Sequence, residues 1–121
     1  MASRNGNKRI LVVDDEWLIA ALLEDMVHEL GHDVVGPAPN VVQALQLIAD
    51  DAPDAAVLDV SLDGARSYPI ADALAERGIP FVFLTGFATS DLPTAYGNRP
   101  ILSKPIGLDM LRVSLSELLA S

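Results

Sequence analysis

Short apolar runs typical of buried β-strands alternate with helical patterns along most of the chain. The run Ala55–Leu58 is the clearest, because four consecutive apolar residues suit a strand that is covered on both faces. Similar runs lie at Ile10–Val13, Val34–Val35, Phe81–Leu84 and Ile101–Leu102. Five strands that alternate with helices predict a parallel sheet with helices on both faces and right-handed crossovers.

Apolar residues at three- and four-residue spacing predict the helices between these strands. Gly31 suits the end of the first helix, Asn40 caps the second, and Pro69 fits the first turn of the third. A fourth helix within Asp91–Asn98 is expected to be short, because a proline and a glycine interrupt it. The residues expected to face the core are Ile19, Leu22, Leu23, Met26, Leu30, Val41, Ala44, Leu45, Ile48, Ile70, Ala71, Leu74, Ala75, Leu108, Leu111, Leu115 and Leu118. The fold class predicted is α/β, a flavodoxin-like doubly wound sheet with strand order 2-1-3-4-5.

Length and composition restrict the kinds of function that the chain can have. Residues 1–8 are polar and are expected to be a disordered tail, and residues 9–121 are expected to be one domain. A net charge of -9 argues against a nucleic-acid partner. No apolar run is long enough to span a membrane, and the first residues do not resemble a signal peptide. The absence of cysteine excludes thiolate metal sites and suits a cytoplasmic location.

Chemically useful side chains follow four of the five predicted strands. Asp14 and Asp15 follow the first strand, Asp59 the third, Thr85 the fourth and Lys104 the fifth. In the predicted strand order these positions meet at one edge of the sheet, where α/β proteins collect their ligands. Each residue has a plainer explanation, as a helix cap, a strand end or a solvated lysine. Four strand ends that all supply the same chemistry argue against that explanation.

The predicted cluster suits phosphoryl transfer. Three neighbouring carboxylates repel one another unless a cation joins them, and Mg²⁺ prefers such oxygen ligands. Asp59, at the centre, is placed to act as a nucleophile that forms an aspartyl phosphate. The Lys104 ammonium and the Thr85 hydroxyl are placed to bind the phosphoryl oxygens.

The chain from about Arg9 to Ala120 resembles a response-regulator receiver domain. The matching motifs are Val12-Val13-Asp14-Asp15-Glu16, Val57-Leu58-Asp59, Leu84-Thr85-Gly86 and Ser103-Lys104-Pro105. The resemblance implies that Asp59 is the phospho-acceptor and that Mg²⁺ is held by Asp14, Asp15, Asp59 and the backbone carbonyl of Ser61. It also implies that Thr85 and Gly86 form the switch and phosphate-binding segment with Lys104, and that Pro105 follows a cis peptide bond.

Within that family, the segment Pro80–Phe87 resembles a subgroup with a Phe-Ala-Thr-Gly-Tyr signature. Members of this subgroup are mostly stand-alone receivers that are served by histidine kinases of the HWE or a related type. The resemblance therefore implies such a sensor kinase as partner, together with an unknown downstream protein. Two positions depart from the family pattern. Ile101 replaces the usual switching aromatic residue, and Leu62-Asp63-Gly64 replaces the usual Met-Pro.

The function predicted is that of a single-domain response regulator, which signals by protein contact or drains phosphate from a kinase, and not of an enzyme. Two alternatives stay open: a phosphorylation-independent adaptor with a receiver fold, and a phosphatase with an aspartyl nucleophile. The phosphatase is less favoured, because its usual second aspartate is Ser61 here. The segment Asp59–Gly64 also resembles the start of an EF-hand calcium-binding loop. This interpretation is rejected, because Ile70 occupies the twelfth position, where a bidentate glutamate is needed. Trp17 is compatible with exposure near the site or with core packing.

Overall fold

The computed structural model of the chain describes residues 8–62, 65–85, 101–104 and 106–120. Within these residues, five parallel strands form one sheet in the order β2-β1-β3-β6-β7. The strands are β1 (Arg9–Val13), β2 (Asp33–Ala38), β3 (Ala55–Asp59), β6 (Phe81–Thr85) and β7 (Ile101–Ser103). Taken in chain order, this is the predicted arrangement 2-1-3-4-5, so the flavodoxin-like sheet is confirmed.

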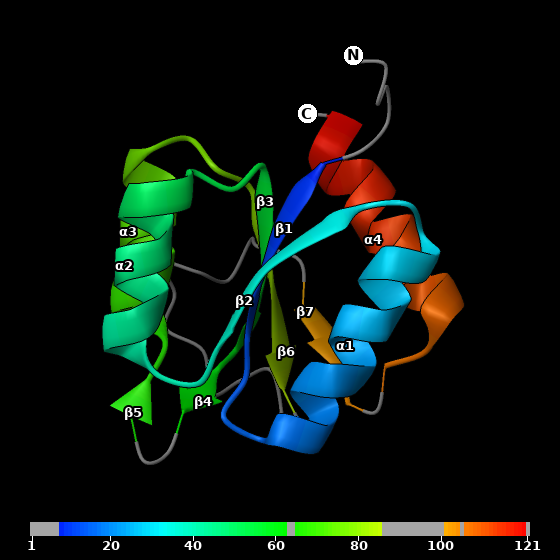
Figure 1. The fold of residues 1–121 in the computed structure, drawn as a ribbon, viewed down its shortest axis with the longest axis horizontal. Coiled ribbons are helices and arrows are strands. Elements are labelled where there is room, and N and C mark those ends of the chain that lie inside the picture. The colour runs from blue at the N-terminus through cyan, green and yellow to red at the C-terminus, as the bar shows by residue number, and fades with distance from the viewer. Residues whose placement is uncertain (1–7, 63–64, 86–100, 105, 121) are drawn as a thin grey trace.

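Helices cover both faces of the sheet (Figure 1). On one face lie α1 (Trp17–Glu29) and α4 (Leu108–Ala120), and on the other lie α2 (Val41–Asp51) and α3 (Tyr68–Glu76). The helix that we expected at 91–98 lies outside the described residues. None of the helices in the described part of the chain is long and apolar enough to cross a membrane.

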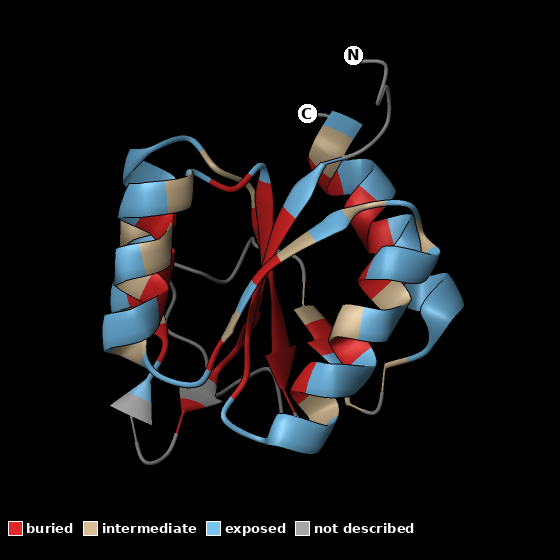
Figure 2. Cartoon of the chain, viewed as in Figure 1, coloured by how far each residue is buried: buried red, intermediate tan, exposed pale blue. Residues whose placement is uncertain are grey.

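The central strands are buried on both sides, as Figure 2 shows. Alternate side chains enter two apolar clusters, one beneath α2 and α3 and one beneath α1 and α4. In β3, Ala56 and Leu58 join the first cluster, whereas Ala55 and Val57 join the second. Each large apolar side chain buried in this way contributes about 1.5–3 kcal/mol. The long apolar runs of the sequence are therefore explained by a sheet that has no solvent face.

The helix patterns were predicted well, with three exceptions. The Asn40 side chain caps α2 by accepting a hydrogen bond from the Gln43 amide at 2.9 Å, and Pro69 lies in the first turn of α3. Leu22, Ala75 and Leu108, however, are exposed rather than packed in the core. In α1 the buried stripe runs through Ala20, Leu23 and Val27, and Leu22 lies about 100° around the helix from Leu23. The spacing of apolar residues shows that one face of the helix is buried, but it does not determine which residue lies at the centre of that face.

The second strand is longer than predicted. We expected it to end at Gly36-Pro37, but β2 continues to Ala38. Its register with β1 shifts by one residue there, because Leu11 pairs with Val35 and Val13 pairs with Ala38. Since β2 is an edge strand, a proline without an amide hydrogen is tolerated, and the bulge absorbs the extra residue. Gly36 has a φ of 97° at this bulge, which glycine adopts readily.

A small hairpin that was not predicted follows β3. Strands β4 (Ser61–Leu62) and β5 (Ala65–Arg66) pair antiparallel, with Leu62 opposite Ala65. The intervening Asp-Gly pair lies outside the described residues. Asp-Gly between two short strands is a known hairpin signal, but two-residue strands are too short to show periodicity.

Candidate functional site

The carboxyl end of β1 and the extension of β2 place Asp14. Its backbone amide donates a hydrogen bond to the Ala38 carbonyl at 3.1 Å, so the bulged part of β2 fixes this position. Its Oδ1 accepts a hydrogen bond from the Glu16 amide at 2.9 Å. Asp14 is buried, whereas the neighbouring Asp15 is exposed. The two acids therefore enter the site in different environments.

Asp59 and Thr85 are the last residues of β3 and β6, which are neighbours in the sheet. Both are buried, with exposed fractions of 6% and 4%. The Thr85 carbonyl accepts a hydrogen bond from the Lys104 amide at 3.0 Å, which attaches the end of β7 to the same edge. The predicted meeting of the four strand ends is therefore present in the fold.

Lys104 bridges this edge from β7 towards β1. Two strand spacings, about 10 Å, separate β7 from β3, and only a long side chain covers such a distance. The Lys104 Nζ lies 3.1 Å from Asp14 Oδ2 and 3.2 Å from Asp59 Oδ2. It also lies 3.2 Å from Glu16 Oε1. A single ammonium is thus shared by three carboxylates.

Two opposing effects act on the charge of Lys104. Burial disfavours the ammonium and lowers the pKa of Lys104. The negative charges of Asp14 and Asp59, together with the hydrogen bond to Asp59, outweigh burial, so that the pKa of Lys104 is raised above its usual value. Lys104 is therefore a permanent cation at neutral pH, as a group that stabilises phosphoryl oxygens needs to be.

The acidic cluster fits a divalent cation. One carboxylate oxygen each from Asp14, Asp15 and Asp59 lies within 4.8 Å of the others. Asp14 Oδ2 is buried and has no hydrogen-bond donor among the described residues, although it lies at ion-pair distance from Lys104. A buried carboxylate oxygen that lacks a donor is costly unless a cation approaches it. Carboxylate oxygens are the ligands that Mg²⁺ prefers, so the residues present suit this ion.

For three residues of the predicted site, the structure gives no side-chain position. Ser61 begins β4, two residues after Asp59, and the structure describes its backbone pairing with Arg66 only. Gly86 and Pro105 lie outside the described residues, as does the expected cis bond before Pro105. Their roles remain predictions.

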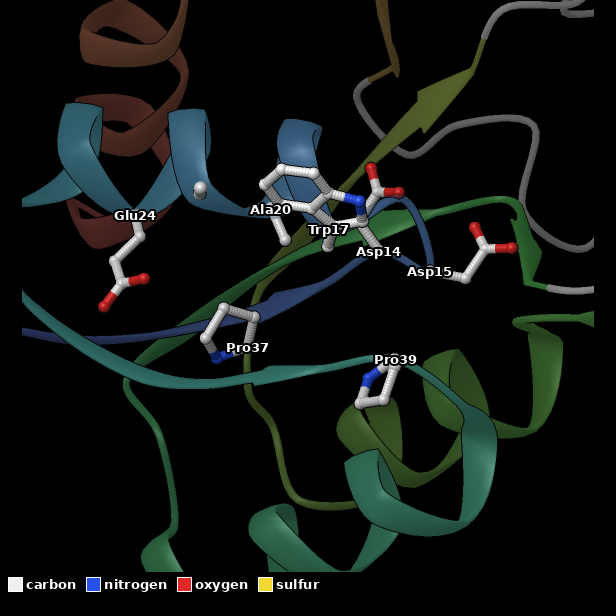
Figure 3. A pocket seen from close by; sticks show the side chains of 8 residues that line it. Asp14, Asp15, Trp17, Ala20, Glu24, Pro37 and Pro39 are labelled. Atoms are coloured by element: carbon white, nitrogen blue, oxygen red, sulfur yellow. The ribbon is translucent and has the colours of Figure 1, made fainter.

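A groove of about 250 Å³ runs beside the acidic residues, between α1 and the end of β2 (Figure 3). Pro37 of β2 and Pro39, just after this strand, line one side, and Trp17, Ala20 and Glu24 of α1 line the other. Trp17 is 79% exposed, which decides between the two interpretations of this residue. It belongs to the surface next to the carboxylates and not to the core.

Comparison with known proteins agrees with the geometry of this edge. Residues 10–116 match the sequence model of the response regulator receiver domain. The chain is a member of this family. Receiver domains act in two-component systems, in which they contact sensor kinases and downstream effectors, and they generally bind Mg²⁺ at an acidic pocket.

Three relatives show how far this receiver domain resembles known proteins. SdrG from Sphingomonas melonis Fr1 is 43% identical, with a TM-score of 0.83 and coverage of 94% of this chain and 98% of SdrG. Sporulation initiation phosphotransferase F of Bacillus subtilis is 25% identical, over 93% of this chain and 94% of that protein. The transcriptional regulatory protein PdtaR of Mycobacterium tuberculosis is 34% identical over 70% of this chain. The matched region is only 42% of PdtaR, so its overall activity does not transfer directly.

One contact in this receiver domain was missed by sequence reasoning. Glu16 was noted only as part of the motif that follows the first strand, yet its carboxylate is one of the three that hold Lys104. Its position next to two acids at a strand end was a signal. The partner, however, lies 88 residues away in the sequence, and the pairing depends on the reach of two long side chains.

Proposed function

We propose that this receiver domain accepts a phosphoryl group on the carboxylate of Asp59, in a Mg²⁺-dependent reaction with a phosphorylated histidine kinase. An Asp59 oxygen attacks the phosphorus, the phosphorus–nitrogen bond of phosphohistidine breaks, and the imidazole leaves. The phosphoryl group is later lost to water. The observation that carries the proposal is the contact of 3.2 Å between Lys104 Nζ and Asp59 Oδ2 at a buried edge lined by two further acids.

Each residue of this edge has a separate role in the proposed reaction. Asp14, Asp15 and Asp59, with the Ser61 carbonyl, would hold the Mg²⁺, which supplies positive charge against the phosphoryl oxygens. Lys104 supplies a second positive charge to the same oxygens, and the hydroxyl of Thr85 donates a hydrogen bond to one of them. Burial of Asp59 keeps bulk water away from its carboxylate.

The signal leaves through contacts with other proteins or through competition for the phosphate of the kinase. The exposed apolar side chains of α1, Trp17, Leu18 and Leu22, support a role in protein contact. We further propose a kinase of the HWE or a related type, on the resemblance of Pro80–Phe87 to the Phe-Ala-Thr-Gly-Tyr subgroup.

Phosphorylation with radiolabelled acetyl phosphate and Mg²⁺ tests the proposal. The wild-type protein is expected to take up label that is stable in acid and sensitive to hydroxylamine, as an acyl phosphate is. Asp59→Asn is expected to take up none. Asp50→Asn, the same substitution at an exposed position of α2, serves as the control and is expected to label normally.

The alternatives give different results in the same experiment. A phosphorylation-independent adaptor takes up no label in the wild-type protein. A phosphatase releases phosphate from a phosphomonoester with sustained turnover, whereas a receiver domain retains its label and turns over slowly. Label that remains undiminished on Asp59→Asn contradicts the assignment of the phospho-acceptor.

A further inference from the structure

Glu16 uses its side chain in an unusual way for the residue that precedes a helix. It is the N-cap residue of α1, but its side chain makes no capping hydrogen bond with that helix. The carboxylate instead accepts a hydrogen bond of 3.2 Å from Lys104 Nζ, at the far side of the site. The contact is therefore not a by-product of helix capping.

The three carboxylates around Lys104 differ in how they meet solvent. The side chains of Asp14 and Asp59 are 0% and 9% exposed, whereas the side chain of Glu16 is 63% exposed. Asp14 and Asp59 already have roles in the proposed reaction, as metal ligand and nucleophile. Glu16 has neither role and is the one of the three that water can solvate when the contact breaks.

Lys104 has to change partners when the site is phosphorylated. In the unphosphorylated protein its ammonium lies at ion-pair distance from all three carboxylates. A phosphoryl group on Asp59 places new anionic oxygens beside Nζ, and an ammonium has only three hydrogens to donate. Release of Glu16 costs least, since this contact is the most exposed of the three.

We propose that Glu16 is a positioning residue that holds the Lys104 ammonium in the unphosphorylated protein and competes with the incoming phosphoryl group for it. The inference rests on the proposed role of Asp59 as phospho-acceptor. The carboxylate of Glu16 also repels anionic donors that approach Lys104 from solvent. Glu16 thereby slows phosphorylation by small donors and weakens the binding of phosphoryl analogues.

The charge-neutral variant Glu16→Gln tests the competition. With acetyl phosphate and Mg²⁺ we expect phosphorylation of Asp59 to be faster by about two- to fivefold, the range typical of an exposed ion pair. The gain is expected mainly as a lower apparent KM for acetyl phosphate, and beryllofluoride is expected to bind more tightly by a similar factor. Raising the salt concentration is expected to shrink both differences, because salt screens exposed charges.

A second readout needs neither Mg²⁺ nor phosphate. The chain has only two lysines, Lys8 and Lys104, so Lys8 serves as an internal reference. We expect limited acylation with acetic anhydride, read by peptide mass spectrometry, to show a higher ratio of modified Lys104 to modified Lys8 in Glu16→Gln. The expected rise is about two- to fivefold, because an amine that has lost one of its three carboxylate partners is held less firmly and is more open to the reagent.

Glu29→Gln is the matched control, since Glu29 is exposed and lies at the opposite end of α1. It makes the same change in net charge and is expected to leave both readouts as in the wild-type protein. Equal behaviour of Glu16→Gln and wild type, or slower phosphorylation of Glu16→Gln, overturns the inference. A wild-type protein that takes up no label refutes the proposed function instead, and the acylation ratio still decides whether Glu16 holds Lys104.

Discussion

The interior of the sheet and its carboxyl edge belong to the same strands but are built on opposite principles. In β3, Ala55–Leu58 are fully buried among apolar neighbours, whereas the next residue, Asp59, is a buried carboxylate paired with Lys104. The interior contains apolar side chains, whose burial away from water stabilises the folded state. The edge brings together four acids and only one lysine, which pairs with three of them, and this surplus of negative charge does not stabilise the fold. Stability therefore resides in the interior, whereas the edge holds the charged groups of the proposed reaction.

The largest effect is expected in the interior, at Phe83. Its ring is fully buried and packs edge-to-face against Phe81, with ring centroids 5.4 Å apart, and against Tyr68 at 6.4 Å. Phe83→Ala is expected to lower the free energy of unfolding by about 3–5 kcal/mol in urea denaturation. Val42→Ala, at a position that is 73% exposed, is the control and is expected to change it by about 0.5 kcal/mol or less. A loss at Phe83 as small as at Val42 would show that this part of the interior is loosely packed.

An intermediate effect is expected where the interior meets the edge, at Gly36. A Cβ added there would lie 2.8 Å from the Ala38 amide nitrogen and 3.2 Å from the Val12 carbonyl, at a φ of 97°. Gly36→Ala is expected to destabilise the fold by about 1–3 kcal/mol and, through Ala38, to weaken Mg²⁺ binding at Asp14. Gly31 also has a positive φ but nothing within 4 Å, so Gly31→Ala separates the backbone cost from the clash. Equal losses in the two variants would mean that the clash is relieved at no cost.

A smaller effect of the opposite sign is expected at the edge itself. If the acids repel one another, Asp15→Asn raises the free energy of unfolding of the metal-free protein by about 0.2–1 kcal/mol. Mg²⁺ at tenfold over its dissociation constant is expected to stabilise the wild-type protein by about 1.4 kcal/mol, and the variant by less. Unfolding in EDTA and in Mg²⁺ measures both quantities. A variant that is less stable than wild type without metal would show that Asp15 mainly serves the local fold.

The smallest change is expected in the pH dependence. The pKa of Lys104 is raised in the folded protein, so its ion pairs stabilise the fold fully below the unfolded pKa of about 10.5. As pH rises above that value, unfolded chains lose the proton before folded ones, and the stabilisation fades. The difference in unfolding free energy between wild type and Lys104→Gln is therefore expected to be constant from pH 7 to about pH 10 and to narrow above it. A difference that narrows already near neutral pH would contradict the pairing.

Much of the fold and of the edge was predictable from the sequence. The continuous apolar runs indicate buried parallel strands, and the strand order brings Asp14, Asp59, Thr85 and Lys104 to one edge without any side-chain detail. What could not be predicted depends on tertiary context. The end of β2 at Ala38 requires knowing that β2 is an edge strand, where a bulge tolerates Gly36-Pro37.

The positions of side chains were less predictable than the positions of the backbone elements. The exposure of Leu22 follows from how α1 is rotated against the sheet, which periodicity leaves open. The contact between Glu16 and Lys104 depends on rotamers of two long side chains. Both features depend on side-chain packing in three dimensions, which the sequence pattern alone does not determine.

The separation of stability from reactivity is tested most directly by Asp59→Asn, measured for both properties in one preparation. The account predicts that the variant takes up no phosphoryl label, while its free energy of unfolding in urea without metal stays within about 1 kcal/mol of the wild-type value or exceeds it. A peptide map of the labelled wild-type protein is expected to place the phosphoryl group on Asp59. A variant that loses several kcal/mol of stability, or that still takes up label, would contradict the account.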